Sequence, residues 1–186
     1  MLKIHPQAYT EAYMHIELFI RIIADAAVIP VILLGAWALI YKVPKGRRFE
    51  AYSRVLMAGL TSYMLAKFIG TVYQPESLRP FEMMGVDPGA FYLNNPGFPS
   101  DHALFVTAIA CAVWFETRMK KLSIVLFGLV ILICLGRVLA LVHTPLDVAG
   151  GVIIALIGAL WYSNVPRKQE VHGHGKSHSK PATSSR

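Results

Sequence analysis

Ionisable residues that could carry out chemistry are concentrated between Arg137 and Asp147. His143 and Asp147 are four residues apart, so both side chains lie on one helical face if Pro145 opens a helix. A carboxylate beside an imidazole fixes its tautomer and raises its basicity, and Arg137 adds a permanent cation. The stretch separates two apolar segments, where ionisable groups are costly and usually functional. It therefore predicts half of a nucleophilic or acid–base site.

The other half is expected from polar residues at the ends of neighbouring apolar segments. These residues are Lys67, Arg79, Ser100, Asp101 and His102. Lys67, Arg79 and Arg137 would place three cations at one water–membrane boundary. Arginine matches the geometry of phosphate, lysine adds a point charge, and a helix beginning near Ser100 would add backbone donors. The set predicts phosphoryl transfer, which depends mainly on positioning and charge neutralisation.

Two histidines allow a division of roles in this chemistry. One, braced by Asp147, attacks phosphorus and forms a phosphohistidine, while His102 protonates the leaving oxygen and later activates water. A metal site and a haem site are the alternative uses of histidine. Three nearby cations would repel a divalent ion, and haem ligands normally face one another inside spans. We therefore expect neither a metal nor a cofactor.

Each of these residues also has a structural explanation when it is taken alone. Lys67 is typical of a lysine that extends toward the membrane surface, and Ser100 and Asp101 are typical of a helix N-cap. Arg137 alone would serve as a topology anchor. It is their joint arrangement that favours a site.

The composition indicates an all-α integral membrane protein. Hydrophobic residues make up 55% of the chain and charged residues 16%, against about 25% charged residues in soluble domains. The net charge of +7 comes from basic residues in short loops and the C-terminal tail, which favours a cytoplasmic membrane face over a nucleic-acid partner. Cys111 and Cys134 lie inside apolar segments and are expected to be packing residues.

The apolar segments predict a bundle of about five transmembrane helices after a short N-terminal interfacial segment. The expected spans are 17–41, 51–73, 100–115, 122–141 and 146–162. Pro30 is expected to kink the first of them. Its polar stripe of Glu17, Arg21 and Asp25 is interpreted as an interfacial ladder of ion pairs, with a wall of the headgroup entrance as the alternative.

The remaining segments complete the predicted organisation. The connection 74–99 is rich in proline and glycine and longer than usual, which favours a functional loop such as a lid. Residues 1–166 are expected to form one membrane-embedded phosphatase domain, and 167–186 a disordered cytoplasmic tail rich in His, Lys and Ser. Basic residues gather on the side of the first loop, third loop and C-terminus. This bias predicts an outer N-terminus, a cytoplasmic C-terminus and an outward-facing site in the plasma membrane.

Two of these stretches resemble motifs of the type 2 phosphatidic acid phosphatase superfamily. The family motif Ser-Arg-x5-His-x3-Asp is matched by Arg137, His143 and Asp147 at the same spacing, with Gly136 in place of serine. The family motif Pro-Ser-Gly-His is matched by the stretch 99–102, which reads Pro-Ser-Asp-His. Both motifs follow in the family order and stand at the ends of predicted spans.

The first family motif, Lys-x6-Arg-Pro, is matched only in part. Arg79-Pro80 is present, but Lys67 precedes Arg79 by twelve positions rather than seven, and Val72 stands where the lysine would be. The form Phe-Pro-Ser-Asp-His-Ala at 98–103 resembles undecaprenyl-diphosphate phosphatases of the bacitracin-resistance type.

The resemblance implies a metal-independent membrane enzyme whose site faces outward. It implies that His143 is the nucleophile, that Asp147 orients it and that His102 is the acid. The implied phosphate-binding residues are Lys67, Arg79, Ser100, Asp101 and Arg137. The implied partner is a polyprenyl diphosphate in the bilayer, used during cell-wall assembly. Phosphatidylglycerol phosphate or phosphatidic acid are the alternative substrates, and a catalytically silent lipid-binding scaffold is the alternative of another class.

Overall fold

The computed structural model describes residues 6–75, 78–95 and 97–163, and within these ranges all regular structure is helical. The helices in chain order are α1 (Pro6–Arg21), the π-helix η1 (Ile22–Ala26), α2 (Val28–Lys42), the 3-10 helix η2 (Lys45–Arg47), α3 (Arg48–Val72), α4 (Pro80–Met84), α5 (Asp101–Glu116), α6 (Lys120–Leu139), α7 (Pro145–Gly158) and the 3-10 helix η3 (Ala159–Tyr162). The expected tail 167–186 lies outside the described residues.

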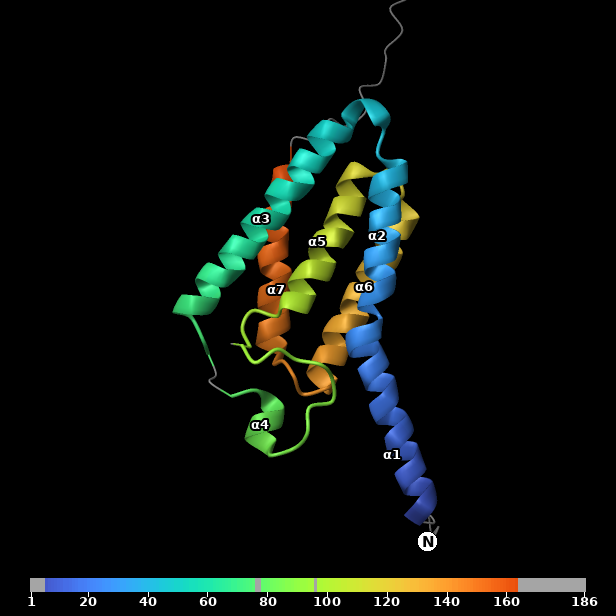
Figure 1. Cartoon of the computed structure of the whole chain (residues 1–186), viewed down its shortest axis with the longest axis vertical. Coiled ribbons are helices and arrows are strands. Elements are labelled where there is room, and N and C mark those ends of the chain that lie inside the picture. The colour runs from blue at the N-terminus through green and yellow to red at the C-terminus, as the bar shows by residue number, and fades with distance from the viewer. Residues whose placement is uncertain (1–5, 76–77, 96, 164–186) are drawn as a thin grey trace, which may run out of the picture.

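Four helical stretches are long and apolar enough to cross a membrane, which confirms an all-α membrane protein. They are Met14–Lys42, Lys45–Val72, Lys120–Leu139 and Pro145–Tyr162. A helix, α5, covers the predicted span at 100–115, but at 16 residues it is not among these four, so four of the five expected spans are found in the described residues. This helix lies in the middle of the bundle, packed against α2, α3, α6 and α7 (Figure 1). Because its neighbours surround it, α5 buries side chains along most of its length.

Small residues bring α7 close to its neighbours and so position its first turn. A Cβ atom on Gly151 would lie 2.5 Å from the carbonyl oxygen of Ser100, and one on Gly158 would lie 2.5 Å from the carbonyl oxygen of Ala58. Both contacts are shorter than side-chain atoms tolerate, so glycine is required there for this approach. The start of α7 is thereby held directly against the start of α5.

The first span differs from a simple kinked helix. The irregular turn is η1, which ends four residues before Pro30. Proline lacks an N–H group and its ring clashes with the carbonyl four residues earlier, here that of Ala26, so the change of helix type falls there. The expected interfacial segment is helical from Pro6 onward, and α1 extends past the bundle beyond η1 (Figure 1).

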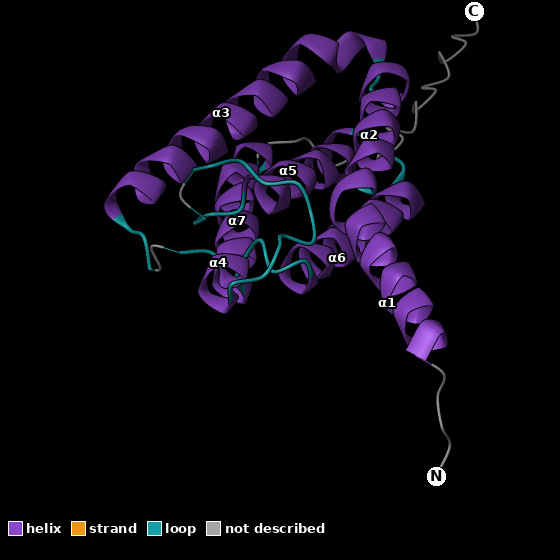
Figure 2. Ribbon diagram, turned by 60° about the horizontal axis from the view of Figure 1, so that its bottom comes forward, coloured by secondary structure: helices purple, strands orange, loops and turns teal. Residues whose placement is uncertain are grey.

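One end of the bundle collects the segments that were expected to form the site. The loop containing α4, the connection from α6 to α7 and the N-terminal end of α5 lie there together (Figures 1 and 2). The loop is joined to the connection by backbone hydrogen bonds from Phe81 N–H to Leu141 O, 3.0 Å, and from Gly89 N–H to Ala140 O, 3.0 Å. The long loop is therefore folded over this end of the bundle.

Candidate active site

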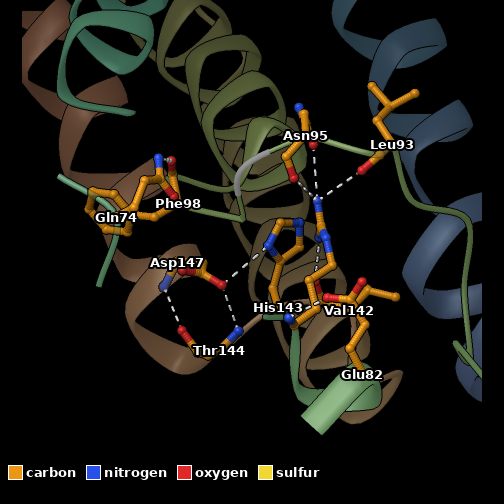
Figure 3. Close-up of polar contacts among 10 residues, drawn as sticks. Gln74, Glu82, Leu93, Asn95, Phe98, Val142, His143, Thr144 and Asp147 are labelled. Carbon is orange, nitrogen blue, oxygen red and sulfur yellow. Dashed lines mark hydrogen bonds and ion pairs between the residues drawn. The ribbon is translucent and has the colours of Figure 1, made fainter. Parts of the chain in front are cut away.

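The start of α7 places His143 and Asp147 as the sequence predicts. Thr144 is the N-cap, and its hydroxyl accepts a hydrogen bond from the Asp147 N–H at 3.2 Å. The Asp147 carboxylate accepts one in return from the Thr144 N–H at 2.8 Å, which completes a capping box. The same carboxylate oxygen lies 3.4 Å from His143 Nδ1 (Figure 3). Asp147 thus caps the helix and faces the imidazole, leaving Nε2 as the ring nitrogen available for chemistry.

The surroundings of His143 keep its imidazole neutral. Burial lowers the pKa of His143 below its ordinary value; the charges of Arg137 and Arg79 act in the same direction, and Asp147 opposes them. A neutral imidazole retains the lone pair that a nucleophile needs. Burial and the two arginines therefore favour the form of His143 that can act as a nucleophile or a base.

Ser100 joins the start of α5 to the start of α7. Its backbone N–H donates to the Asp147 carbonyl at 2.9 Å, and its side chain is fully buried. The Ser100 hydroxyl has no hydrogen-bond partner among the described residues. A buried hydroxyl without a partner is costly unless a ligand or water supplies one. This donor is therefore suited to an oxygen-rich ligand.

The candidate site encloses a cavity of about 50 Å³. It is lined by Arg79, Leu93, Asn95, Pro99, Asp101, His102, Arg137 and His143. Two arginines and two histidines from different segments thus converge on one small space. The cavity favours a compact anion, since cations and proton-transfer groups surround it.

Arg79 is held by backbone carbonyls from two segments. Its Nη1 donates to Val142 O at 2.6 Å, and its Nη2 donates to Leu93 O at 3.1 Å and to both Asn95 oxygens at 3.0 and 3.1 Å (Figure 3). The guanidinium also lies 5.3 Å from the centre of the Tyr92 ring. Arg79 therefore ties the loop to the α6–α7 connection while its charge lines the cavity. Asn95 was not singled out in the sequence.

Arg137 is the most deeply buried charge of the site. Only 1% of it is exposed, and its Nη1 donates to Asp25 Oδ1 at 2.8 Å and to Phe91 O at 2.8 Å. Its Nε has no partner among the described residues. The interpretation of Asp25 as part of an interfacial ladder with Arg21 and Glu17 is wrong, because Asp25 pairs with Arg137 instead.

Lys67 is placed at the edge of the site rather than in the cavity. Its Nζ lies 3.2 and 3.3 Å from the two Asp101 oxygens, and both side chains are nearly half exposed. Asp101 lines the cavity, whereas Lys67 does not. The structure brings together Arg79, Ser100, Asp101, His102, Arg137, His143 and Asp147, and attaches Lys67 through Asp101. The catalytic and phosphate-binding roles of all these residues, Lys67 and Asp101 included, stay predictions.

Comparisons with known proteins match this chain to one superfamily and to two phosphatases. The PAP2 superfamily model matches residues 51–170. Undecaprenyl-diphosphatase BcrC of Bacillus subtilis (strain 168) is 30% identical over 127 residues, which cover 68% of this chain and 61% of that protein. Human sphingosine-1-phosphate phosphatase 2 is 41% identical over 73 residues, 36% of this chain and 18% of that protein. The chain thus matches less than two thirds of either relative, and no solved structure matches it significantly.

Proposed function

This chain belongs to the PAP2 superfamily, and from that premise we propose that it is a membrane lipid phosphatase that hydrolyses a polyprenyl diphosphate, such as undecaprenyl diphosphate, to the monophosphate. One observation carries the proposal: His143, faced by Asp147, shares a small cavity with His102, Arg79 and Arg137. Such a space suits a terminal phosphate group with a nucleophile on one side of it and a proton donor nearby.

The reaction proceeds in two steps. In the first, His143 Nε2 attacks the terminal phosphorus and forms a nitrogen–phosphorus bond. The phosphorus–oxygen bond to the lipid monophosphate breaks, and His102, which enters this step protonated, gives its proton to the oxygen that leaves. In the second, His102 takes a proton from water, which attacks the phosphohistidine. The nitrogen–phosphorus bond then breaks, inorganic phosphate is released and His143 returns to its neutral form.

The arginines stabilise the charge that develops on the transferred group. Arg137 offers its unpartnered Nε, and the Arg79 charge lines the same cavity. Ser100 lies between Pro99 and Asp101, which line the cavity, and its buried hydroxyl is a further, neutral donor without a partner among the described residues. Because the site is largely removed from water, these charges act more strongly on the phosphate than they would at an exposed surface. No step of this mechanism requires a metal.

The substrate assignment follows from similarity to the Bacillus undecaprenyl-diphosphatase, over a larger share of the chain than the match to the human phosphatase. The second candidate function is hydrolysis of a lipid monophosphate, such as phosphatidic acid, phosphatidylglycerol phosphate or sphingosine 1-phosphate. The same two histidines would serve either reaction. A silent scaffold is disfavoured, because it would have no use for buried, unpartnered donors around a cavity.

A panel of lipid phosphates tests the substrate. We expect the purified protein to release phosphate from undecaprenyl diphosphate at least about tenfold faster, in kcat/KM, than from phosphatidic acid or sphingosine 1-phosphate. The rate is expected to be unchanged with a chelator present. A preference for a lipid monophosphate would replace the substrate assignment. Activity lost with chelator and restored by a divalent ion would overturn the metal-free mechanism.

We propose that the site faces the outside of the plasma membrane, as the distribution of basic residues favours. A cysteine replacing the exposed Met84, in a variant with Cys111 and Cys134 changed to alanine, should react with an impermeant thiol reagent on intact cells. The connection between α2 and α3 lies at the opposite end of the bundle (Figure 1), and a cysteine replacing Gly46 in that connection should react only after lysis. The reverse pattern would show that the site faces the cytoplasm.

A further inference from the structure

The carboxylate of Asp25, in the first span, connects three separate parts of the molecule. Its Oδ1 accepts a hydrogen bond from Arg137 Nη1 at 2.8 Å, and its Oδ2 accepts one from the Phe91 N–H at 2.9 Å. Arg137 Nη1 also donates to Phe91 O at 2.8 Å. The three residues thus close a ring of hydrogen bonds between η1, α6 and the long loop.

The local backbone explains how Asp25 reaches Arg137. An unbroken α-helix would place Asp25 on the same face as Arg21 and Glu17, which are largely exposed. Asp25 instead lies within η1, whose wider turn changes the direction in which its side chains point. Such π-helical turns are often found at functional sites.

Gly136 allows η1 to approach α6 closely. A Cβ atom on Gly136 would lie 2.9 Å from the backbone nitrogen of Ala24 and 3.0 Å from its Cα. Ala24 is fully buried in this contact. A serine at position 136, which the family motif Ser-Arg-x5-His-x3-Asp has there, would force η1 and α6 apart. Gly136 therefore permits the close contact between η1 and α6 through which Asp25 reaches Arg137.

We propose that Asp25 is a positioning residue of the active site, which holds one edge of Arg137 and the Phe91 backbone so that the rest of the guanidinium faces the cavity. Asp25 does not line that cavity, and it acts through Arg137. Arg137 Nε remains unpartnered among the described residues and is free to bind phosphate. The inference rests on the proposed function only in requiring that a phosphate group is the ligand of Arg137.

Two features separate this role from that of an ordinary ion pair. The pair lies beside the reaction centre, since Arg137 shares the cavity with both histidines. The ring also fixes Phe91, which precedes the Leu93 and Asn95 carbonyls that hold Arg79. Loss of Asp25 would therefore release one phosphate-binding arginine directly and loosen the support of the other.

The test is a double-mutant cycle with Asp25→Ala and Arg137→Ala, measured as kcat/KM with radiolabelled substrate. In the natural background, we expect Asp25→Ala to lower kcat/KM roughly 30-fold and to weaken inhibition by orthovanadate, a phosphate analogue. In the Arg137→Ala background, we expect Asp25→Ala to lower kcat/KM by no more than about threefold further, because only its hydrogen bond to the Phe91 N–H is left to lose. If Asp25→Ala lowers kcat/KM by the same factor in both backgrounds, the positioning role is overturned.

Controls keep this test independent of folding and of the substrate assignment. Glu17→Gln removes a carboxylate two turns earlier on the same span, where the side chain is exposed, and should leave both measurements unchanged. Asp25→Asn keeps the size of the side chain and one acceptor oxygen, and we expect it to lose less activity than Asp25→Ala. Activity of Asp25→Ala equal to that of the natural protein would also overturn the proposal. The cycle uses whichever lipid phosphate the natural protein hydrolyses best, so failure of the polyprenyl assignment leaves it interpretable.

Discussion

Replacing His143 with alanine is expected to lower kcat/KM by about 10⁴-fold or more and to remove the phosphoenzyme. The reason is that His143 supplies the nitrogen that attacks phosphorus, and alanine offers no substitute. No other imidazole in the described residues both faces a carboxylate and lines the cavity. The measurement is release of labelled phosphate from the lipid substrate, followed by alkaline gel analysis for a labelled protein band.

His15→Ala is the matched control for the loss of an imidazole. His15 is exposed on α1, outside the site, and its replacement should leave the rate unchanged. Retention of full activity by His143→Ala would show that another group attacks phosphorus. A circular-dichroism melt of both variants would establish that the fold is intact.

Replacing His102 with alanine is expected to lower kcat/KM by about 10²- to 10⁴-fold and to make the phosphoenzyme accumulate. His102 has two tasks in the proposed mechanism, and the second, activation of water, limits release of phosphate from His143. An activated aryl phosphate needs little help from an acid to expel its leaving group. With that substrate, His102→Ala should therefore form the phosphoenzyme rapidly and hydrolyse it slowly.

Comparing the lipid substrate with the aryl phosphate separates the two tasks of His102. With the lipid substrate, His102→Ala should slow both the formation and the hydrolysis of the phosphoenzyme. With the aryl phosphate, it should slow mainly the hydrolysis. Asp101→Asn, which changes the neighbouring acid at the edge of the cavity, is the comparison variant and should not trap the intermediate. Equal slowing on both substrates without any trapped intermediate would contradict the role of His102.

The features that the sequence predicts best are those set by nearby residues. The start of α7 at Pro145 follows from proline at the first helical position, and the structure adds the Thr144–Asp147 capping box. The same four-residue spacing places His143 beside Asp147. The apolar segments likewise predict four of the five expected spans, because a bilayer requires a certain length of apolar helix.

The features that the sequence could not predict depend on contacts between distant segments. Asp25 and Arg137 are separated by 112 residues, and their pairing requires a π-helical turn. Pro30 predicts an irregularity in this helix, but not its type or the residue that Asp25 meets. The carbonyls that hold Arg79 come from loop backbone, whose path depends on packing over the bundle. The Lys67–Asp101 pair also spans two helices. Spacing within a motif therefore indicates which residues act, but not what holds them.

The Arg137–Asp25 pair also bears on how the protein enters the membrane. The residues that match the superfamily begin at position 51, whereas the carboxylate that neutralises Arg137 lies at position 25. A fragment restricted to the matched residues would have to insert α6 with an uncompensated cation in its last turn. The first span is made before α6 and can meet it during synthesis. We therefore expect the smallest unit that inserts in its functional form to be longer than the segment by which the superfamily is recognised.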